Sequence, residues 1–470
     1  MYAQTDKNVL KQDFIQKTGW LLKDEYDAFE AALGAVPPVS IRFNPHKQRE
    51  DGSLPAVCVA GMENVPWCES GFYLPERPSF TFDPLFHAGV YYVQEASSMF
   101  LEQAMRRILS DAEFAEKRLT ALDLCAAPGG KSTHLLTLLP EDSLLICNEV
   151  IRNRSLILAE VIAKWGHAST MITQNDPKTF GHLPALFDVI LADVPCSGEG
   201  MIRKDQTDSV DHVKLCAARQ RRIIHDVWPA LKPGGYLIYS TCTFNTEENE
   251  ENVFALAQSL DAAIIPIPVK PAWNIAGALC HDIPVYRFFP HRIRGEGFFM
   301  ALLRKQDDSK PAATLKNIQH PPVSIKNPAL PDAIKNWVSN PERFLFRHTT
   351  TAVHAVPAAN DNICTLLSKH LNTLSTGIRV GEWTGKMFTP SAAMALSTEL
   401  NPDAFPTIDL SYEQAISYLQ RESTTLPESY PKGFVLVTFQ NHPLGFVKNI
   451  GTRANNLYPQ EWRIRNRVKR

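Results

Sequence analysis

The sequence predicts an α/β protein built on a doubly wound parallel sheet, and three observations lead to this fold class. Short apolar segments recur along residues 119–240, and amphipathic helical segments separate them. These segments are apolar almost throughout, as expected for strands that helices cover on both faces. The first segment runs into a glycine-rich turn, which is typical of a sheet that binds a nucleotide-like ligand at its edge.

Composition sets the class of protein. The 470 residues allow two to four domains of about 100–200 residues each, and contents of 44% hydrophobic and 21% charged residues are ordinary for a globular chain. The formal net charge of -2 means that any nucleic-acid contact must come from local basic patches. No apolar run reaches the roughly 18 residues of a membrane span. The N-terminus lacks the apolar stretch of a signal peptide, so we expect a cytoplasmic protein without membrane contact.

The cysteines indicate a reducing compartment. There are nine of them, an odd number, and no two are spaced Cys-x-x-Cys. This pattern favours reduced thiols over a disulfide framework or a zinc site. We therefore expect no metal, and we expect some thiols to be free for chemistry.

Four parts follow one another along the chain. Residues 1–60 alternate helix and short strand signals, which predicts a small N-terminal α/β domain of the RNA-binding type. Residues 61–305 begin with loops rich in proline and aromatic residues and a helix from about 96 to 109, and then carry the regular α/β rhythm. Residues 306–378 are rich in Pro, Lys and Asp at their start and are predicted to be a linker and connecting domain. Residues 379–470 predict a small β-rich domain with a basic tail.

Strands of the central sheet are expected wherever an apolar run is bounded by polar or turn residues. Two more runs, 262–268 and 295–305, are expected to close the unit. The five principal runs are 119–124, 143–148, 170–173, 187–193 and 235–240.

The turn after the first strand has two interpretations. The stretch "LDLCAAPGGKST" (122–133) ends like the phosphate loop of an NTPase, whose pattern is G-x-x-x-x-G-K-[ST]. The first glycine of that pattern would stand at position 125, which is Cys125, and Pro128 lies inside the phosphate cradle. The NTPase interpretation therefore fails where backbone geometry matters. The alternative is the first turn of a doubly wound sheet, with a helix that begins near Lys131.

Carboxylates after the next strands favour this alternative. Glu149 follows the second strand, Asp176 the third, and Asp193 ends the fourth. A single carboxylate at a strand end is usually a helix N-cap. Three in succession after a glycine-rich turn instead indicate a ligand site at the carboxyl edge of the sheet. An acidic ring disfavours a phosphate-rich ligand and suits S-adenosylmethionine, which carries a ribose diol, an adenine amine and a sulfonium cation.

Two cysteines lie beside the same edge. Cys196 follows the fourth strand in "DVPCSGEG", and Cys242 follows the fifth in "STCTFNTEEN". A cysteine is most often a small buried hydrophobe, but a loop at a strand end favours chemistry for these two. Arg203 and Lys204 are near enough in sequence to help hold a thiolate, which is the reactive form.

Together these motifs resemble the RNA cytosine-C5 methyltransferases with two active-site cysteines. The segments "CAAPGGKS", "DVPCSGEG" and "STCTFNTEEN" carry the resemblance, and "GVYYVQEASSM" and "HRIRGEGFFMALLRK" extend it over about residues 30–305. The one departure is Val194, where the family usually has alanine. More weakly, "GEWTGKMFTPS" and "GFVKNIGTRANNLYP" resemble the PUA-like RNA-binding module of the bacterial small-subunit rRNA methyltransferases in this family.

The resemblance assigns roles to the residues. It implies a Rossmann-like methyltransferase core in which Cys242 attacks cytosine C6, Cys196 assists product release, and Asp193 hydrogen-bonds the cytosine N3/N4 edge. Glu149 is then expected on the cofactor ribose and Asp176 near its adenine. The target base must be flipped out or unpaired, because C5 and C6 are stacked inside a helix. The cofactor is expected to lie on the backbone of Cys125, Ala126, Ala127, Pro128, Gly129, Gly130 and Lys131.

The same resemblance implies a monomer that methylates 16S rRNA, within the small ribosomal subunit, and uses S-adenosylmethionine. A tRNA cytosine-C5 methyltransferase is the alternative, and a non-catalytic RNA-binding assembly factor or an NTPase is a more distant one. The basic residues Arg463, Arg465 and Arg467 alternate as on one face of a strand, and with Lys469 and Arg470 they form either a phosphate-binding patch or a frayed terminus. Lys386, Lys448 and Arg453 could extend such a patch. The sequence does not identify the target cytidine.

Overall fold

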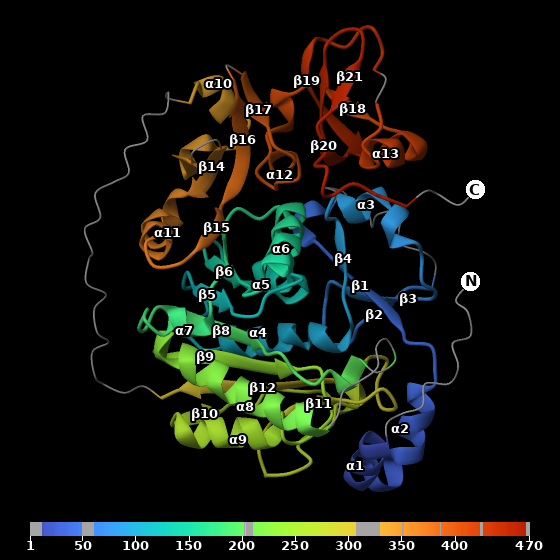
Figure 1. Cartoon of the computed structure of the whole chain (residues 1–470), viewed down its shortest axis with the longest axis vertical. Coiled ribbons are helices and arrows are strands. Elements are labelled where there is room, and N and C mark those ends of the chain that lie inside the picture. The colour runs from blue at the N-terminus through green and yellow to red at the C-terminus, as the bar shows by residue number, and fades with distance from the viewer. Residues whose placement is uncertain are drawn as a thin grey trace.

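Figure 1 shows the structure of the protein, a computed structural model of the whole chain. The described residues form four β-sheets, and helices pack on these sheets. No helix of that part is long and apolar enough to cross a membrane. The described residues are 12–48, 61–201, 203, 210–306, 330–349, 352–385, 387–423 and 426–466.

The central sheet confirms the predicted doubly wound arrangement. Nine strands of the described chain belong to it, in the order β10-β12-β9-β8-β5-β6-β7-β15, with β11 paired to β12. The five predicted strands are parallel neighbours, while β10, β11 and β12 beyond β9 and β15 at the other edge pair antiparallel. The bounds are β5 (Thr120–Asp123), β6 (Leu144–Asn148), β7 (Thr170–Thr173), β8 (Phe187–Asp193), β9 (Leu231–Thr241), β10 (Ala262–Ile264), β11 (Tyr286–Phe288), β12 (Phe298–Lys305) and β15 (Thr373–Thr376).

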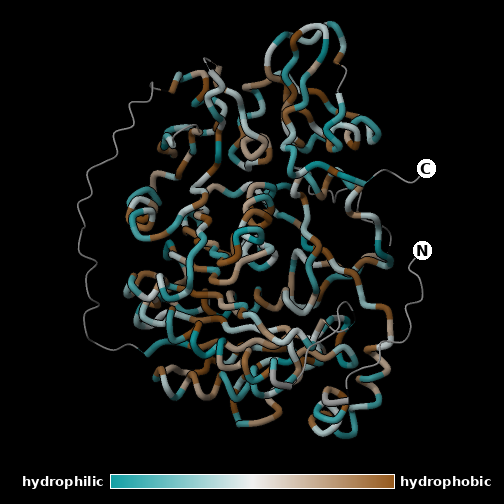
Figure 2. The backbone as a smooth tube through the Cα atoms, in the orientation of Figure 1, coloured by the Kyte–Doolittle hydropathy of each residue, from teal (hydrophilic) through white to brown (hydrophobic). Residues whose placement is uncertain are grey.

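Helices cover both faces of this sheet, which explains why its strands lack polar alternation. Along β8, Val189 and Leu191 join the core under α4, α5 and α6, whereas Ile190 and Ala192 join the core under α7, α8 and α9. Figure 2 shows the hydrophobic stretches of these strands inside the molecule. The helices are α4 (Leu101–Leu109), α5 (Gly130–Leu138), α6 (Arg152–Trp165), α7 (Pro177–Phe180), α8 (Val210–Val227) and α9 (Glu250–Ser259).

A four-stranded N-terminal sheet has the order β2-β3-β1-β4. It crosses residue 60, where we expected the first domain to end, because β1 takes β3 and β4 as its pairing partners. Helices α1 and α2 pack against the loop after β9, where the rings of Phe29 and Phe244 lie 5.0 Å apart. The elements are α1 (Gln12–Leu22), α2 (Tyr26–Leu33), α3 (Pro84–His87), β1 (Val39–Phe43), β2 (Glu63–Asn64), β3 (Gly71–Leu74) and β4 (Tyr91–Val93).

The C-terminal region contains two further four-stranded sheets, β13-β14-β16-β17 and β18-β19-β20-β21. The first crosses residue 378, the expected end of the connecting segment, and that segment also supplies β15 to the central sheet. The elements are β13 (Phe344–His348), β14 (Ala352–Pro357), β16 (Ile378–Thr384), β17 (Met387–Pro390), β18 (Thr407–Asp409), β19 (Gly433–Phe439), β20 (His442–Asn449), β21 (Ala454–Asn456), α10 (Asp332–Lys335), α11 (Asp361–Ser368), α12 (Ala392–Ala395) and α13 (Tyr412–Leu419).

The N-terminal part, the central domain and the C-terminal region share hydrophobic cores. Ile41 and Phe43 of the N-terminal sheet lie in one hydrophobic cluster with Tyr418 and Val435 of the C-terminal region. Helix α6 ends at Trp165, and the next residue, Gly166, has a left-handed φ of +86°. A Cβ there would lie 2.3 Å from the Leu396 carbonyl oxygen. Glycine at this position therefore lets the C-terminal region approach the central domain. Figure 1 shows that the N-terminal part and the C-terminal region both lie next to the central sheet.

Candidate active site

The site lies at the edge where the five parallel strands end. Parallel strands bring their carboxyl ends to the same edge, so the loops that follow β5, β6, β8 and β9 become neighbours. The Ala126 amide donates to the Asn148 carbonyl at 2.8 Å, and the Val194 amide donates to the Ser240 carbonyl at 3.1 Å. These hydrogen bonds join the loops in pairs, and the arrangement places the predicted residues around one site.

The glycine-rich turn leads from β5 into α5. Gly129 has a φ of +121°, and a Cβ there would lie 2.7 Å from Val161 Cγ1. A Cβ on Gly130 would lie 2.9 Å from the Tyr92 ring. We expected these glycines to admit a cofactor to the backbone, but contacts within the protein already require them. Arg154 donates to the Ala127 carbonyl at 2.8 Å and so holds the turn from the other side.

Asp123, the last residue of β5, is a member of the site that we did not predict from the sequence. It is fully buried, and its Oδ2 accepts a hydrogen bond from Ser132 at 2.7 Å. Its Oδ1 is buried without a partner within the described protein. Burial raises the pKa of Asp123 to about 7, and the nearby charge of Asp193 adds to this shift. The signal in the sequence was its place directly before the glycine-rich turn.

Glu149 and Asp176 lie where the strand order predicted them, and both have local partners. Glu149 accepts the Ile151 amide at 2.8 Å and pairs with Arg154 at 3.3 Å. Asp176 is exposed and accepts the Lys178 amide at 3.0 Å, so it does cap α7. The helix N-cap, which the sequence pattern disfavoured relative to a ligand role, is therefore present at Asp176.

The two cysteines of the strand-end loops face each other. Their Sγ atoms lie 3.1 Å apart, and the Cys242 amide lies 3.3 Å from Cys196 Sγ. The pKa of Cys242 is lowered, first because its sulfur accepts a hydrogen bond from Cys196 and also because the Lys131 ammonium is near. The pKa of Cys196 is raised by that same hydrogen bond and by burial. The geometry thus favours a thiolate on Cys242 and a protonated thiol on Cys196.

Lys131 has a role in the site that we did not predict from the sequence. We expected its backbone to line the cofactor and assigned no role to its side chain. Instead its ammonium donates to Asp193 Oδ2 at 2.8 Å, and Ser240 donates to Asp193 Oδ1 at 2.7 Å. The carboxylate is therefore fixed from both sides, and a cation lies beside the thiolate of Cys242. The Gly-Gly-Lys motif indicated the position of Lys131 but not the direction of its side chain.

Two buried carboxylates hold the cysteine loops in place. Glu199 accepts hydrogen bonds from the Thr243 hydroxyl at 2.6 Å, the Phe244 amide at 3.0 Å and the Asn245 amide at 2.9 Å. Glu248 accepts the Ser197 amide at 3.0 Å. Both glutamates thus join the loop after β8 to the loop after β9. Glu199 lies in the first loop and binds the second, and Glu248 lies in the second and binds the first. Both stand inside the motifs "CSGEG" and "TEEN", although we had singled out only the cysteines of these motifs.

Arg203 does not reach the thiolate. It pairs with Glu296 at 2.9 Å and donates to the Gly295 carbonyl at 2.7 Å and to the Ala32 carbonyl of α2 at 3.3 Å, so its buried guanidinium joins the N-terminal helices to the core. The suggestion that it holds a thiolate is therefore wrong. Lys204 lies outside the described residues.

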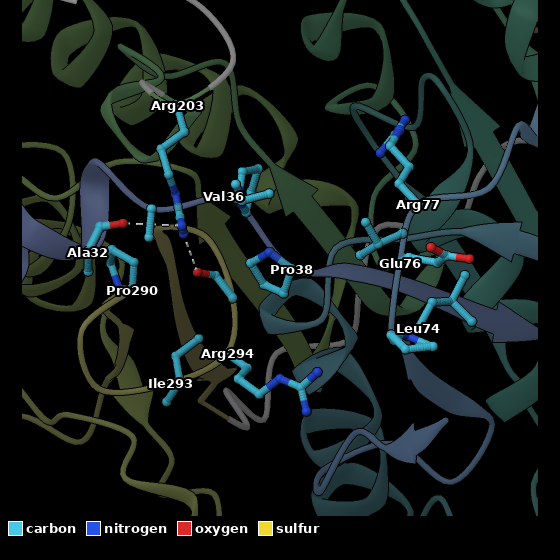
Figure 3. A pocket seen from close by; sticks show the side chains of 15 residues that line it. Ala32, Val36, Pro38, Leu74, Glu76, Arg77, Arg203, Pro290, Ile293 and Arg294 are labelled. Carbon is cyan, nitrogen blue, oxygen red and sulfur yellow. Dashed lines mark hydrogen bonds between the residues drawn. The ribbon is translucent and has the colours of Figure 1, made fainter. Parts of the chain in front are cut away.

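A groove opens between the N-terminal part and the central domain (Figure 3). It has a volume of about 460 Å³, and its walls combine apolar residues such as Pro38 and Ile293 with the guanidinium groups of Arg77, Arg203 and Arg294. Backbone hydrogen bonds connect this wall to the active site, because the Gly297 amide donates to Gly200 and the Gly200 amide donates to Cys242. The groove wall at Gly295 is thus two residues along the chain from this connection.

The basic C-terminal segment is only partly described. Arg463 and Arg465 are exposed on either side of the buried Ile464, but residues 461–466 form turns and irregular structure, so the expected strand is wrong there. The Ile464 amide donates to Leu419, which fixes this segment on α13. Lys386, Arg467, Lys469 and Arg470 lie outside the described residues.

Comparison with known proteins identifies the family of this chain. A family model for the 16S rRNA methyltransferase RsmB/F matches residues 114–304. Models for the N-terminal domain of 16S rRNA methyltransferase RsmF and for the methyltransferase RsmF PUA domain match residues 10–96 and 405–464. Two curated proteins named Ribosomal RNA small subunit methyltransferase F, from Cronobacter sakazakii and Escherichia coli, are each 32% identical and cover 93% of this chain and 92% of their own length.

Solved structures share the fold of the central part. A methyltransferase homologue from Pyrococcus horikoshii is 27% identical, with a TM-score of 0.52, and covers 62% of this chain and 93% of its own. NSun6 from the same organism, solved with SFG, is 21% identical, with a TM-score of 0.53, and covers 64% of this chain and 99% of its own. Because the likeness to the curated relatives runs through nearly the whole length of both chains, the chain belongs to the RsmF group of 16S rRNA methyltransferases.

Proposed function

We propose that the protein transfers a methyl group from S-adenosylmethionine to C5 of a cytidine in 16S rRNA, through a covalent bond between Cys242 and cytosine C6. The observation that carries this proposal is the pair of sulfur atoms 3.1 Å apart, one favoured as a thiolate and the other as a thiol. One thiolate and one thiol at one site suit a reaction that first needs a nucleophile and then, once the second thiol has lost its own proton, a proton acceptor.

The residues present fit the cofactor. Asp123 Oδ1 is a buried acceptor without a partner in the described protein, and it lies at the start of the turn where the cofactor backbone contacts are expected. With Asp193 and Glu149 it makes this edge acidic, which suits a cationic ligand with a ribose diol better than a polyphosphate. The residues that would hold the cofactor are those of the Cys125–Lys131 turn, with Glu149 on the ribose and Asp176 near the adenine. When bound, S-adenosylmethionine supplies an electrophilic methyl group.

The first step belongs to Cys242. Its thiolate adds to C6 and forms a sulfur–carbon bond, and the electrons of the C5–C6 double bond make C5 nucleophilic toward the methyl group. Asp193, fixed by Lys131 and Ser240, is placed to accept a hydrogen bond from the cytosine N4 amine. This contact orients the ring so that C6 faces the sulfur.

The second step belongs to Cys196. Bond formation consumes the charge on Cys242 and so removes the main cause of the raised Cys196 pKa. Cys196 can then lose its proton to water and accept the C5 proton. The electrons of the C5–H bond restore the C5–C6 double bond, and Cys242 leaves as a thiolate. The two cysteines therefore divide the work in a fixed order.

The flanking parts suit an RNA substrate. The groove beside the cysteine loops offers Arg77 and Arg294 to phosphates and apolar walls to an unpaired base (Figure 3). We further propose that the protein acts as a monomer on the small ribosomal subunit in the cytoplasm, where the two thiols stay reduced.

Bisulfite mapping of rRNA from cells with and without the gene tests this function. We expect one or more cytidines of 16S rRNA to lose C5 methylation in the deletion strain and to regain it with the intact gene, but not with Cys242→Ala. Unchanged 16S rRNA together with a lost mark on tRNA would instead support the tRNA methyltransferase alternative. Activity on purified small subunits, compared with naked rRNA, identifies the form of the substrate.

A further inference from the structure

A cluster of three potential metal ligands lies where the N-terminal sheet meets the central domain. Cys68 precedes β3, Glu102 lies on α4, and His134 lies on α5. All three are buried, with exposed fractions of 3%, 3% and 0%. Their ligand atoms lie within 4.8 Å of one another, and no step of the proposed methyl transfer uses them.

The three atoms converge on one point. Cys68 Sγ lies 3.7 Å from His134 Nε2, and Glu102 Oε2 lies 3.6 Å from the same nitrogen. A single N–H cannot serve a thiol and a carboxylate in different directions, and 3.6 Å is too long for a hydrogen bond between nitrogen and oxygen. A zinc ion with bonds of about 2.3 Å to sulfur and about 2.0 Å to nitrogen separates these ligands by roughly 3.5 Å at tetrahedral angles. The observed spacing therefore suits a shared ion better than a hydrogen-bonded triad.

Neighbouring groups orient the carboxylate. Arg106 donates to Glu102 Oε1 through Nε at 3.0 Å and through Nη2 at 2.8 Å. The Glu69 amide also donates to Glu102, at 3.2 Å from Oε2. Ligating carboxylates are usually held in this way by further hydrogen bonds. The Arg106 contacts fix one oxygen and leave Oε2 facing His134.

A fourth ligand position lies near Ser70. Its hydroxyl oxygen is 3.8 Å from Cys68 Sγ, on the part-exposed side of the cluster. A water bound to the ion would supply the fourth ligand of a tetrahedral site. Thiolate and carboxylate together bring two negative charges to this buried place, and Arg106, which pairs with Glu102 at 2.8 Å, brings one positive charge beside them.

We propose that Cys68, Glu102 and His134 form a structural zinc site that joins the N-terminal sheet to helices α4 and α5. Our expectation of no metal rested on cysteine spacing, which cannot show ligands contributed by three distant elements. The site lies one helical turn from Gly130, where α5 begins beside the cofactor turn. A bound ion therefore fixes the junction between the two parts of the chain.

Cobalt titration tests the site independently of methyltransferase activity. The full-length protein is stripped with a chelator and titrated with Co²⁺ alone. We expect one equivalent to give a thiolate-to-cobalt absorption band together with the intense visible bands of tetrahedral cobalt, and Zn²⁺ to abolish both. Cys68→Ser should remove the thiolate band, and His134→Gln, which removes a direct ligand, should weaken Co²⁺ binding by more than the about 10–100-fold that loss of an outer-shell partner costs.

Two controls separate this site from other thiols. Cys216→Ser removes another buried cysteine that faces a histidine, since its Sγ lies 3.4 Å from His212 Nε2, and it should leave the band unchanged. A Cys196→Ala, Cys242→Ala double variant removes the close thiol pair of the active site and should also keep the band. Both controls leave the cluster intact, so they remain informative if Cys68→Ser fails to fold. No band in the unaltered protein, its survival in Cys68→Ser, or its loss in the double variant would overturn the proposal.

Discussion

The sulfur of Cys242 lies 3.1 Å from the sulfur of Cys196. The hydrogen bond from Cys196 lowers the pKa of Cys242, with a smaller contribution from the Lys131 ammonium, whereas the pKa of Cys196 is raised. This asymmetry distinguishes two residues that are chemically identical. A hydrogen bond donated by Cys196 stabilises the Cys242 thiolate, and the same bond keeps the proton on Cys196. These opposite pKa shifts agree with the proposed order, in which Cys242 attacks first and Cys196 acts second.

The cysteine pair gives the first prediction. Cys242→Ala removes the nucleophile and should reduce methylation by ~10³-fold or more, without a covalent product. Cys196→Ala keeps the nucleophile but removes the group that accepts the C5 proton, so the RNA adduct should accumulate. Denaturing gel electrophoresis with labelled rRNA measures the adduct, and Cys216→Ser is the control. An adduct in Cys242→Ala and none in Cys196→Ala would reverse the assignment.

Lys131 gives the second prediction. Lys131→Gln keeps the length of the side chain but removes the cation that stabilises the Cys242 thiolate. The pKa of Cys242 should rise, so the acid limb of the pH–rate profile should move to higher pH and the rate near pH 7 should fall about tenfold or more. The rate should recover partly at high pH. Lys335→Gln removes a lysine paired on the surface with Asp332 and should leave the profile unchanged. A uniform loss at every pH would contradict the electrostatic role.

Some of this site was predictable from the sequence, and the reason is topological. Residues that follow successive parallel strands must lie at one edge, so the order of Glu149, Cys196 and Cys242 along the chain was enough to bring them together. Side-chain direction was not predictable in the same way. Nothing in "GGKS" shows that Lys131 turns toward Asp193, which lies 62 residues away.

Pairing between strands far apart in the chain was also not predictable from the sequence. Strand β15 adds to the edge of the central sheet across about 200 residues, from a segment whose composition indicated a connection. Its short polar sequence, "TLST", resembles many loops. The pairing depends on the free edge of β7, and a local pattern carries no information about such an edge. The proposed zinc ligands were missed for the same reason, because three elements contribute one each.

Glu199 gives the third prediction. Its carboxylate oxygen Oε2 holds three consecutive residues after Cys242, and Glu199→Gln replaces this charged acceptor by a neutral amide oxygen, which accepts more weakly. We expect a loss of about 1–3 kcal/mol in the free energy of unfolding and a fall in kcat, with little change in the KM for S-adenosylmethionine. Chemical denaturation and steady-state kinetics measure these effects. Glu251→Gln changes an exposed partner of Thr246 and is the matched control. Equal behaviour of the two variants would remove Glu199 from the support of the site.

The groove gives the fourth prediction. Arg294 stacks on Tyr73 at 4.3 Å and pairs with Glu63, and its side chain is still half exposed to a phosphate. Arg294→Ala and Arg77→Ala should raise the KM for rRNA severalfold, leave kcat nearly unchanged and each reduce the salt slope of binding by about 0.7–0.9. Filter binding at several salt concentrations measures the slope. Arg343→Ala, which removes an exposed arginine paired with Glu141, is the control. If the salt dependence of RNA binding did not change in either variant, the groove would not be part of the RNA-binding surface.

Asp123 gives the fifth prediction, which concerns stability. Its pKa of about 7 in the folded protein lies above the usual 3.8, so between these values the folded state holds a proton that the unfolded state has lost. The free energy of unfolding of the cofactor-free protein should therefore fall as pH rises from 4 to 7, by up to about 4 kcal/mol from this group. Asp123→Asn should flatten that dependence and make the cofactor-free protein more stable at pH 8, because the amide never ionises.

The same substitution should weaken S-adenosylmethionine binding, since the charge that destabilises the free protein is the one expected to meet the cationic ligand. Thermal unfolding at several pH values, with and without S-adenosylmethionine, measures both effects. Asp188→Asn is an instructive comparison, because Asp188 is as deeply buried but pairs with Lys117 and Lys232. Removing its charge should lower stability at pH 8. If Asp123→Asn also lowered the stability at pH 8, the ionised Asp123 carboxylate would be favourable in the folded protein. Burial of a carboxylate without a cationic partner would then not be the cause of a raised pKa.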